Sequence, residues 1–228
     1  PAAPAKSKAG KDPGAAPAKP TKRAKPTPAQ EVMAYFQREF GPVDRQSLAE
    51  IVPTTDPPVR IHIVRPNPKS EYVTLFTTGL STRPMNVPPG AEEYRFAELF
   101  LQLPADWPLD LPSLSRRKRG WPVSWLRGLA GLPHAADTWL GPGYGTVGNG
   151  DPPEPITPGL PFTVGFVLAE RSFRRSDGAT VQLYRAVPIT TAEWELYQRD
   201  GVAALGAALD AAGVGTGDGL RARYDAGA

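Results

Sequence analysis

The feature that most constrains the fold is the uneven distribution of large apolar side chains along the 228 residues. Residues 1–26 are built from Ala, Pro, Lys, Gly and a few other small or charged residues, with no branched aliphatic, Met or aromatic side chain. A segment of this composition cannot bury enough apolar surface to offset the entropy lost on ordering, so we expect a disordered arm. The fold must come from the remaining residues, about 200, which suffice for one domain with a substantial core.

The charge follows the same division. Residues 1–30 hold seven basic residues and one acidic residue, net +6, whereas the whole chain is net +3, so residues 31–228 carry −3. A basic arm is typical of segments that contact nucleic acid or acidic surfaces. A nucleic-acid-associated regulator acting through the arm is therefore one open hypothesis, although the acidic remainder does not favour a nucleic-acid groove and any such binding is expected to be weak.

Composition excludes several kinds of site. There are no cysteines, which removes disulfides, thiolate metal sites and cysteine nucleophiles, and the only histidines are His62 and His134. No apolar run approaches the roughly 18 residues that span a bilayer. The lysine-rich start is not followed by the apolar stretch of a signal peptide. We therefore expect a cytoplasmic protein with no metal, no cofactor and no membrane partner.

Helices are predicted from caps and apolar spacing. Thr27 with Gln30 forms a capping box, and the helix that it opens should end at Gly41. A second capping box, Thr190–Glu193, predicts another helix late in the chain, followed by an Ala/Leu-rich helical stretch. Residues 121–130 place three large apolar side chains four positions apart, as one face of a helix requires.

Strands are predicted between these helices. The candidate segments are rich in β-branched and aromatic residues, and a Ser-Asp-Gly turn at 176–178 predicts that the last two form a hairpin. They are residues 59–64, 72–78, 96–103, 162–169 and 180–187. We expect a single α/β (α+β) domain over residues 27–213, with residues 214–228 fraying as a C-terminal tail.

Motifs for catalysis are mostly absent. Neither a phosphate-binding glycine loop nor a nucleophile elbow occurs. Ser81, His134 and Asp137 can be assembled into a triad on paper, and Glu98 is a carboxylate in a strand where outward exposure is expected. His62 falls on the polar side of an alternating strand, which predicts an exposed or hydrogen-bonded side chain. A hydrolase with a carboxylate-based site in the loop-rich cleft remains the enzymatic alternative.

Five segments, taken in order, carry a family resemblance. They are Phe76–Ser81 with Met85, Glu98–Pro104 with Trp107, Trp121–Arg127, Gly143–Thr146, and Tyr184–Thr190 with Glu193. Together they resemble the suppressor of fused domain over residues 30–210. The resemblance implies a mixed, largely antiparallel sheet flanked by helices and no catalytic activity. Many relatives carry histidine where Tyr144 stands here, so a ligand or metal role is not carried over to that position.

The resemblance also implies a function. Animal members resemble two-lobed regulators that sequester a transcription factor, and bacterial single-domain members are associated with immunity against polymorphic toxins. We therefore expect a non-catalytic protein-binding module, either an immunity protein that neutralises a toxin domain or a regulator that sequesters a partner. An acidic domain can mask the basic face of a nuclease toxin. The candidate partner contacts lie in or beside the loops 79–89 and 141–161, and they are Thr78, Ser81, Arg83 and Tyr144.

Overall fold

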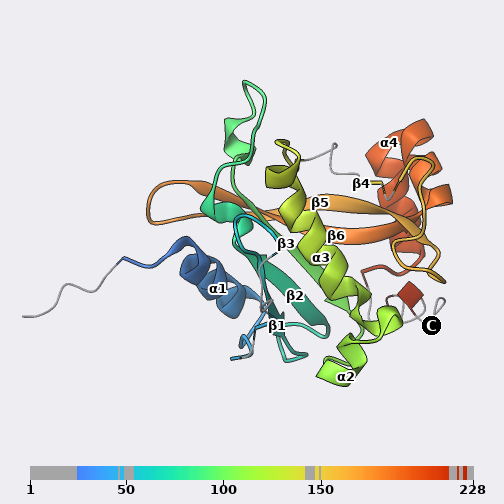
Figure 1. Cartoon of the computed structure of the whole chain (residues 1–228), viewed down its shortest axis with the longest axis horizontal. Coiled ribbons are helices and arrows are strands. Elements are labelled where there is room, and N and C mark those ends of the chain that lie inside the picture. The colour runs from blue at the N-terminus through green and yellow to red at the C-terminus, as the bar shows by residue number, and fades with distance from the viewer. Residues whose placement is uncertain are drawn as a thin grey trace, which may run out of the picture.

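The computed structural model describes residues 25–45, 47–48, 54–141, 147–148, 150–215, 220 and 223–224. The predicted arm lies outside these residues except for its last two positions, and Tyr144 lies outside them too. The helices are α1 (Pro28–Glu39), α2 (Leu111–Leu114), α3 (Arg117–Ala135) and α4 (Thr191–Ala211), with short 3₁₀ turns η1 (Leu80–Thr82) and η2 (Glu92–Tyr94). The strands are β1 (Arg60–Val64), β2 (Val73–Thr78), β3 (Ala97–Leu103), β4 (Val147–Gly148), β5 (Phe162–Arg174) and β6 (Thr180–Thr190) (Figure 1).

The described strands form one sheet in the order β1-β2-β3-β6-β5-β4. Only the central pair, β3 with β6, is parallel, and all other neighbours are antiparallel. The sequence-based prediction of a mixed, largely antiparallel sheet with helices is therefore confirmed. The β5–β6 hairpin turns through 176–178 as predicted, and Gly178 supplies the positive φ of +90° that the turn requires.

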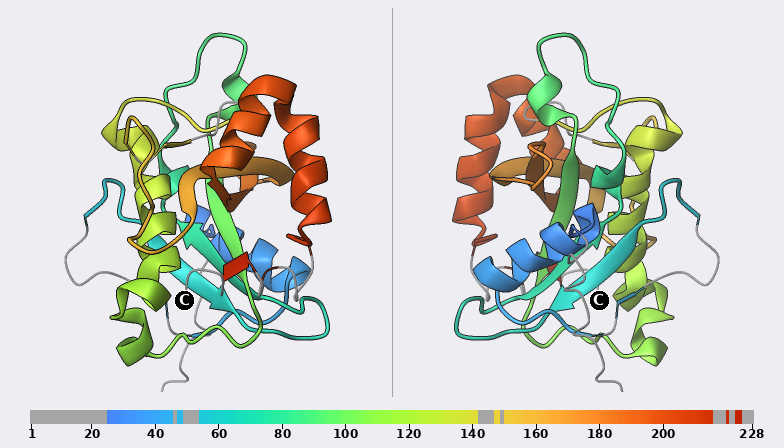
Figure 2. Two further views of the ribbon diagram at one scale, coloured as in Figure 1. Left: turned by 90° about the vertical axis from the view of Figure 1, so that its right-hand side faces the viewer. Right: turned by 90° about the vertical axis from the view of Figure 1, so that its left-hand side faces the viewer.

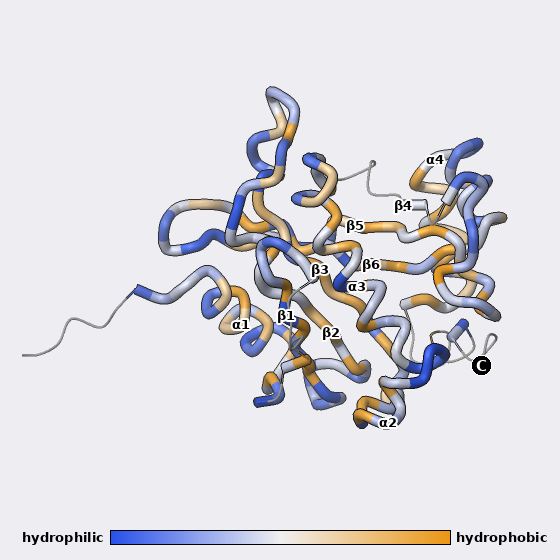
Figure 3. Tube along the Cα trace, in the orientation of Figure 1, coloured by the Kyte–Doolittle hydropathy of each residue, from blue (hydrophilic) through white to orange (hydrophobic). Residues whose placement is uncertain are grey.

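Helices cover both faces of the sheet, with α3 on one side and α1 and α4 on the other (Figure 2). Phe36 of α1 stacks on Phe76 of β2 with ring centroids 3.9 Å apart. On the other face Trp125 of α3 lies against Gly165 of β5, where a Cβ atom would come within 2.8 Å of the indole. The strands are accordingly hydrophobic along most of their length (Figure 3), because each must be apolar on both faces.

The two capping boxes are present. Thr27 Oγ1 accepts from the Gln30 backbone N–H, and Thr190 Oγ1 accepts from the Glu193 N–H, while both long side chains reach back to their caps. Helix α4, which the second capping box opens, continues through a break at Gly201, whose φ is +82°. The predicted helix 121–130 is the middle of the longer helix α3.

Of the expected C-terminal tail, 214–228, the structure describes residues 214, 215, 220, 223 and 224. Leu220 and Tyr224 are buried in the main core, and the Tyr224 ring packs against Trp107 and Trp121. Arg223 forms an ion pair with Glu193 at 2.8 Å. An aromatic side chain contributes a large buried area, so Tyr224 is held by its packing against the core.

Candidate functional site

The turn after β2 is built around a buried carboxylate. Glu98 of β3 is 0% exposed, so the expectation that it points outward is wrong. Its Oε1 accepts from the Gly79 N–H, the Ser81 N–H and the Ser81 hydroxyl at 3.0, 3.0 and 2.7 Å. Its Oε2 accepts from the Thr77 hydroxyl at 2.6 Å. Gly79 and Ser81, at the start of the η1 turn, therefore enclose the carboxylate at this strand position.

This network organises the turn and leaves Glu98 no access to a substrate. Burial raises the pKa of Glu98, while the hydrogen bonds from Thr77, Ser81 and Gly79 act against that rise. Each carboxylate oxygen is already occupied by donors from the chain itself. A general acid or base must reach a reacting group, so the geometry does not support the carboxylate-based hydrolase.

Thr78 is also internal. It is buried, and its hydroxyl is 2.9 Å from His62 Nε2, beneath the ring stack of His62 and Phe76. His62 is hydrogen-bonded as predicted, but it is buried rather than exposed because α1 covers that face of β1 and β2. Burial, with Arg60 nearby, lowers the pKa of His62 to about 4, so the imidazole is neutral near pH 7.

Of the predicted contacts in the described residues, Arg83 alone presents its side chain to solvent. Thr78 and Ser81 hold the turn from inside, whereas the Arg83 side chain is 47% exposed. Its guanidinium donates to the Asp56 carboxylate at 3.2 Å and to the Asp56 carbonyl at 3.0 Å. Its Nε approaches His134 Nδ1 at 3.4 Å, and His134 Nε2 lies 3.2 Å from the Leu80 carbonyl.

Ser81, His134 and Asp137 do not form a catalytic triad in the structure. Ser81 donates its hydroxyl proton to Glu98, and His134 contacts Arg83 and a backbone carbonyl instead of the serine. Asp137 is exposed and follows the end of α3 with a φ of +49°. A nucleophile needs its base within hydrogen-bond reach, and these three side chains have separate partners.

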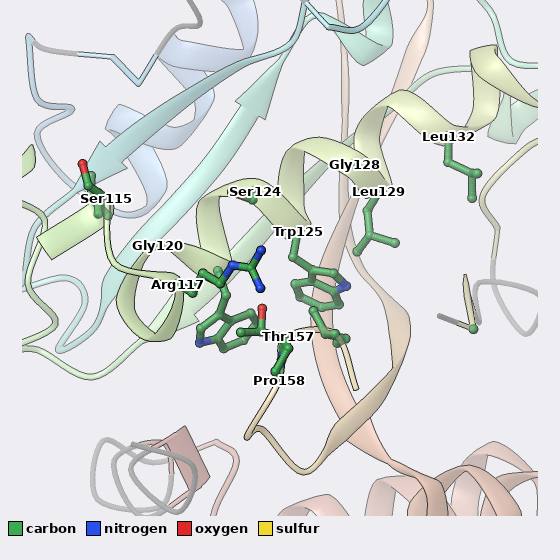
Figure 4. Close-up of a pocket in the computed structure, with 14 residues that line it drawn as sticks. Ser115, Arg117, Gly120, Ser124, Trp125, Gly128, Leu129, Leu132, Thr157 and Pro158 are labelled. Carbon is green, nitrogen blue, oxygen red and sulfur yellow. The ribbon is translucent and has the colours of Figure 1, made fainter. Parts of the chain in front are cut away.

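Arg83 lies at the edge of a groove that crosses α3. An apolar pocket of about 560 Å³ lies between α3 and the 156–158 loop (Figure 4). Trp125 and Arg117 extend from the helix toward Thr157 and Pro158 in this view. The apolar part of its lining consists of Leu114, Trp121, Trp125, Leu129, Leu132, Ile156 and Pro158.

A second pocket of about 510 Å³ lies beside the same helix, and we call it the polar pocket because most of its lining residues are charged or polar. Its charged and titratable lining residues come from the 54–56 segment, the turn after β2 and α3, and they are Asp56, Arg83, Arg127 and His134. The two pockets share Ser124, Gly128 and Leu132. We call the two pockets together the α3 groove.

The α3 groove is positively charged on an acidic domain. Its lining includes Arg83, Arg117 and Arg127 against the single carboxylate of Asp56, a net +2 with histidine neutral, whereas residues 31–228 sum to −3. No carboxylate lines the apolar pocket. Within the described part of the chain no cluster of His, Asp and Glu could hold a metal ion. Nor do the residues placed by the structure include a helix able to cross a bilayer. The arrangement fits binding of an amphipathic, acidic group.

The sequence pointed to Arg83 and to the loop 141–161, which supplies Ile156 and Pro158 to the groove, but it did not assign Trp125 to a site. Arg83 was predicted as a contact, and it borders the polar pocket. Trp125 was interpreted as part of a core stripe, although it is only partly buried. The available signal was Gly128, because a glycine inside a helix costs stability and so indicates another requirement at that position.

Comparison of the sequence with models of known protein families identifies the family of this chain. A family model described as suppressor of fused protein (SUFU) matches residues 55–216, which is most of the chain. The chain belongs to the suppressor of fused family. The match includes every residue that lines the α3 groove except Thr54. No curated protein sequence matches the chain.

Two solved structures share the suppressor of fused fold. A homologue from Neisseria gonorrhoeae has a TM-score of 0.55 at 18% identity, and the alignment covers 82% of this chain and 90% of that one. A chain from the Sufu–Fu complex has a TM-score of 0.54 at 12% identity, covering 78% and 81%. At these identities the likeness concerns the fold.

Proposed function

We propose that this suppressor of fused domain is a non-catalytic protein-binding module whose partner occupies the α3 groove. The observation that carries the proposal is an open, apolar and cationic groove on a domain whose buried carboxylate is closed off by its own turn. Each pocket has a volume within the usual range of ligand sites, roughly 300–1,000 Å³. The structural neighbour crystallised as a Sufu–Fu complex supports a protein as the partner.

In its finer form, the proposal is a cytoplasmic immunity protein that neutralises a toxin domain. The charge of −3 over residues 31–228 complements a basic toxin surface, and complementary potentials favour association and discriminate between partners. The α3 groove has the opposite sign, so the toxin would place an acidic segment there. A regulator that sequesters another protein would use the same groove.

Coexpression tests this function. A candidate toxin domain, taken from the genes that flank this one, is expressed with the full chain, and growth and copurification are measured. We expect rescue and a retained complex; a toxin that stays lethal and does not copurify contradicts the immunity form. A Gly128→Phe variant reports whether the groove is used, because a Cβ at Gly128 meets no atom within 4 Å. Gly206→Phe in α4 is the matched control, since its Cβ also meets open space.

A further inference from the structure

The residues that the two pockets share form the centre of the α3 groove, which we call the saddle. Ser124, Gly128 and Leu132 follow one another at four-residue spacing, which places them on one row along the helix. Ser124 and Gly128 are exposed and small, and all three residues border both pockets. A partner peptide crossing α3 at Gly128 would therefore place side chains that are a few positions apart in the two pockets.

The apolar pocket fits a bulky apolar side chain. Trp125 and Leu129 form its wall where α3 lies on the sheet, and Ile156 lines it from the facing loop. Trp121, which is buried, adds a further aromatic surface to the lining.

The polar pocket fits a carboxylate. Arg83 is held there by Asp56, whose side chain is 87% exposed, so the existing ion pair is largely solvated. Exposed ion pairs contribute little stability and exchange readily. A guanidinium can hold an incoming carboxylate through two parallel hydrogen bonds, and His134 beside it adds a further polar contact.

The width of the helix sets the spacing between these two side chains. Trp125 and Leu129 lie on one flank of the saddle, and Arg127 and Gly131 lie on the other. A helix with side chains is roughly 10 Å across. In the polyproline II conformation an extended chain advances about 3.1 Å per residue with three residues per turn, so side chains three positions apart lie on one face and roughly cover that width.

We propose that the α3 groove binds an extended acidic peptide segment that carries a bulky apolar residue about three positions from an Asp or Glu. The apolar side chain enters the pocket of Trp125, and the carboxylate pairs with Arg83. This inference rests on the proposed protein-binding function and specifies the segment that a partner must present.

A peptide selection tests the inference. A phage library of random 12-residue peptides is selected on the immobilised full chain and counter-selected on Gly128→Phe. The expected consensus is an aromatic or branched aliphatic residue about three positions from an acidic one. A synthetic consensus peptide should bind Gly128→Phe at least about tenfold more weakly, while Gly206→Phe binds as the unmodified chain does.

A double-mutant cycle tests the ion pair. Arg83→Gln and an Asp→Asn change in the peptide should each weaken binding by about tenfold, and together by little more than either alone. An empty selection, a consensus without the acidic residue, additive effects, or equal binding to Gly128→Phe would each overturn the inference. The toxin rescue separates the two levels: rescue that survives Gly128→Phe keeps protein binding and rejects the groove.

Discussion

Acidification should destabilise this domain through the buried imidazole of His62. The imidazole is 6% exposed, accepts or donates one hydrogen bond at Thr78, and stacks on Phe76 with centroids 5.1 Å apart. Burial first, and then Arg60, lowers its pKa from 6.5 to about 4. The folded protein therefore resists the proton that the unfolded chain accepts.

The magnitude follows from this pKa difference. A group whose pKa is lowered by folding contributes stability that is fully present above its unfolded pKa and is lost as the pH falls through its folded pKa. At 1.36 kcal/mol per pH unit, the interval from 6.5 to about 4 corresponds to about 3 kcal/mol. About 2 kcal/mol of this should already be lost at pH 5.

Urea denaturation monitored by tryptophan fluorescence between pH 8 and pH 5 measures the effect, because Trp107 and Trp121 are buried. His62 should lower the unfolding free energy of the unmodified chain by about 2 kcal/mol over this range, while the raised pKa of Glu98 acts in the opposite direction. His62→Gln has no imidazole to titrate, so it should be less stable at pH 8 but lose much less on acidification. An equal change of unfolding free energy in the two proteins between pH 8 and pH 5 would refute the reasoning.

Substitutions at three further positions test the described contacts by urea denaturation at pH 7.5. Gly79→Ala should destabilise by at least about 3 kcal/mol, because φ is +123° and the new Cβ would lie 2.2 Å from the Pro58 carbonyl oxygen; a loss under 1 kcal/mol contradicts this. Glu98→Gln should cost no more than about 1 kcal/mol, since an amide oxygen can keep the donors on Oε1, whereas Glu98→Ala should cost about 3; equal losses would refute the acceptor role. Tyr224→Ala should cost about 3 kcal/mol, and a neutral result would restore the frayed tail.

Local patterns predicted the elements well because caps, turns and apolar spacing act within a few residues. The capping box at Thr27 and the turn at 176–178 are examples. The buried positions of His62 and Glu98 were not predictable in this way. Alternation along β1 cannot reveal that α1 covers its polar side, and the strand around Glu98 does not contain the turn that supplies its hydrogen bonds.

The candidate site shows the same limit. The α3 groove joins the helix to the 54–56 segment and the 156–158 loop, which are about 100 residues apart in the chain and have no shared motif. Arg83 could be proposed from the family resemblance, but its role beside Asp56 and His134 depends on tertiary structure.

The parallel pairing of β3 with β6 has a consequence for how the chain folds. β1, β2 and β3 join neighbours close in sequence, and so do β5 and β6, so each group can form rapidly by itself. The seam between them pairs Ala97 with Gln182, residues 85 positions apart, and closing so long a loop has an entropic cost that hairpins avoid. Glu98 lies on that seam opposite Leu183, so the residue that holds the η1 turn through its carboxylate also belongs to the strand that joins the two groups.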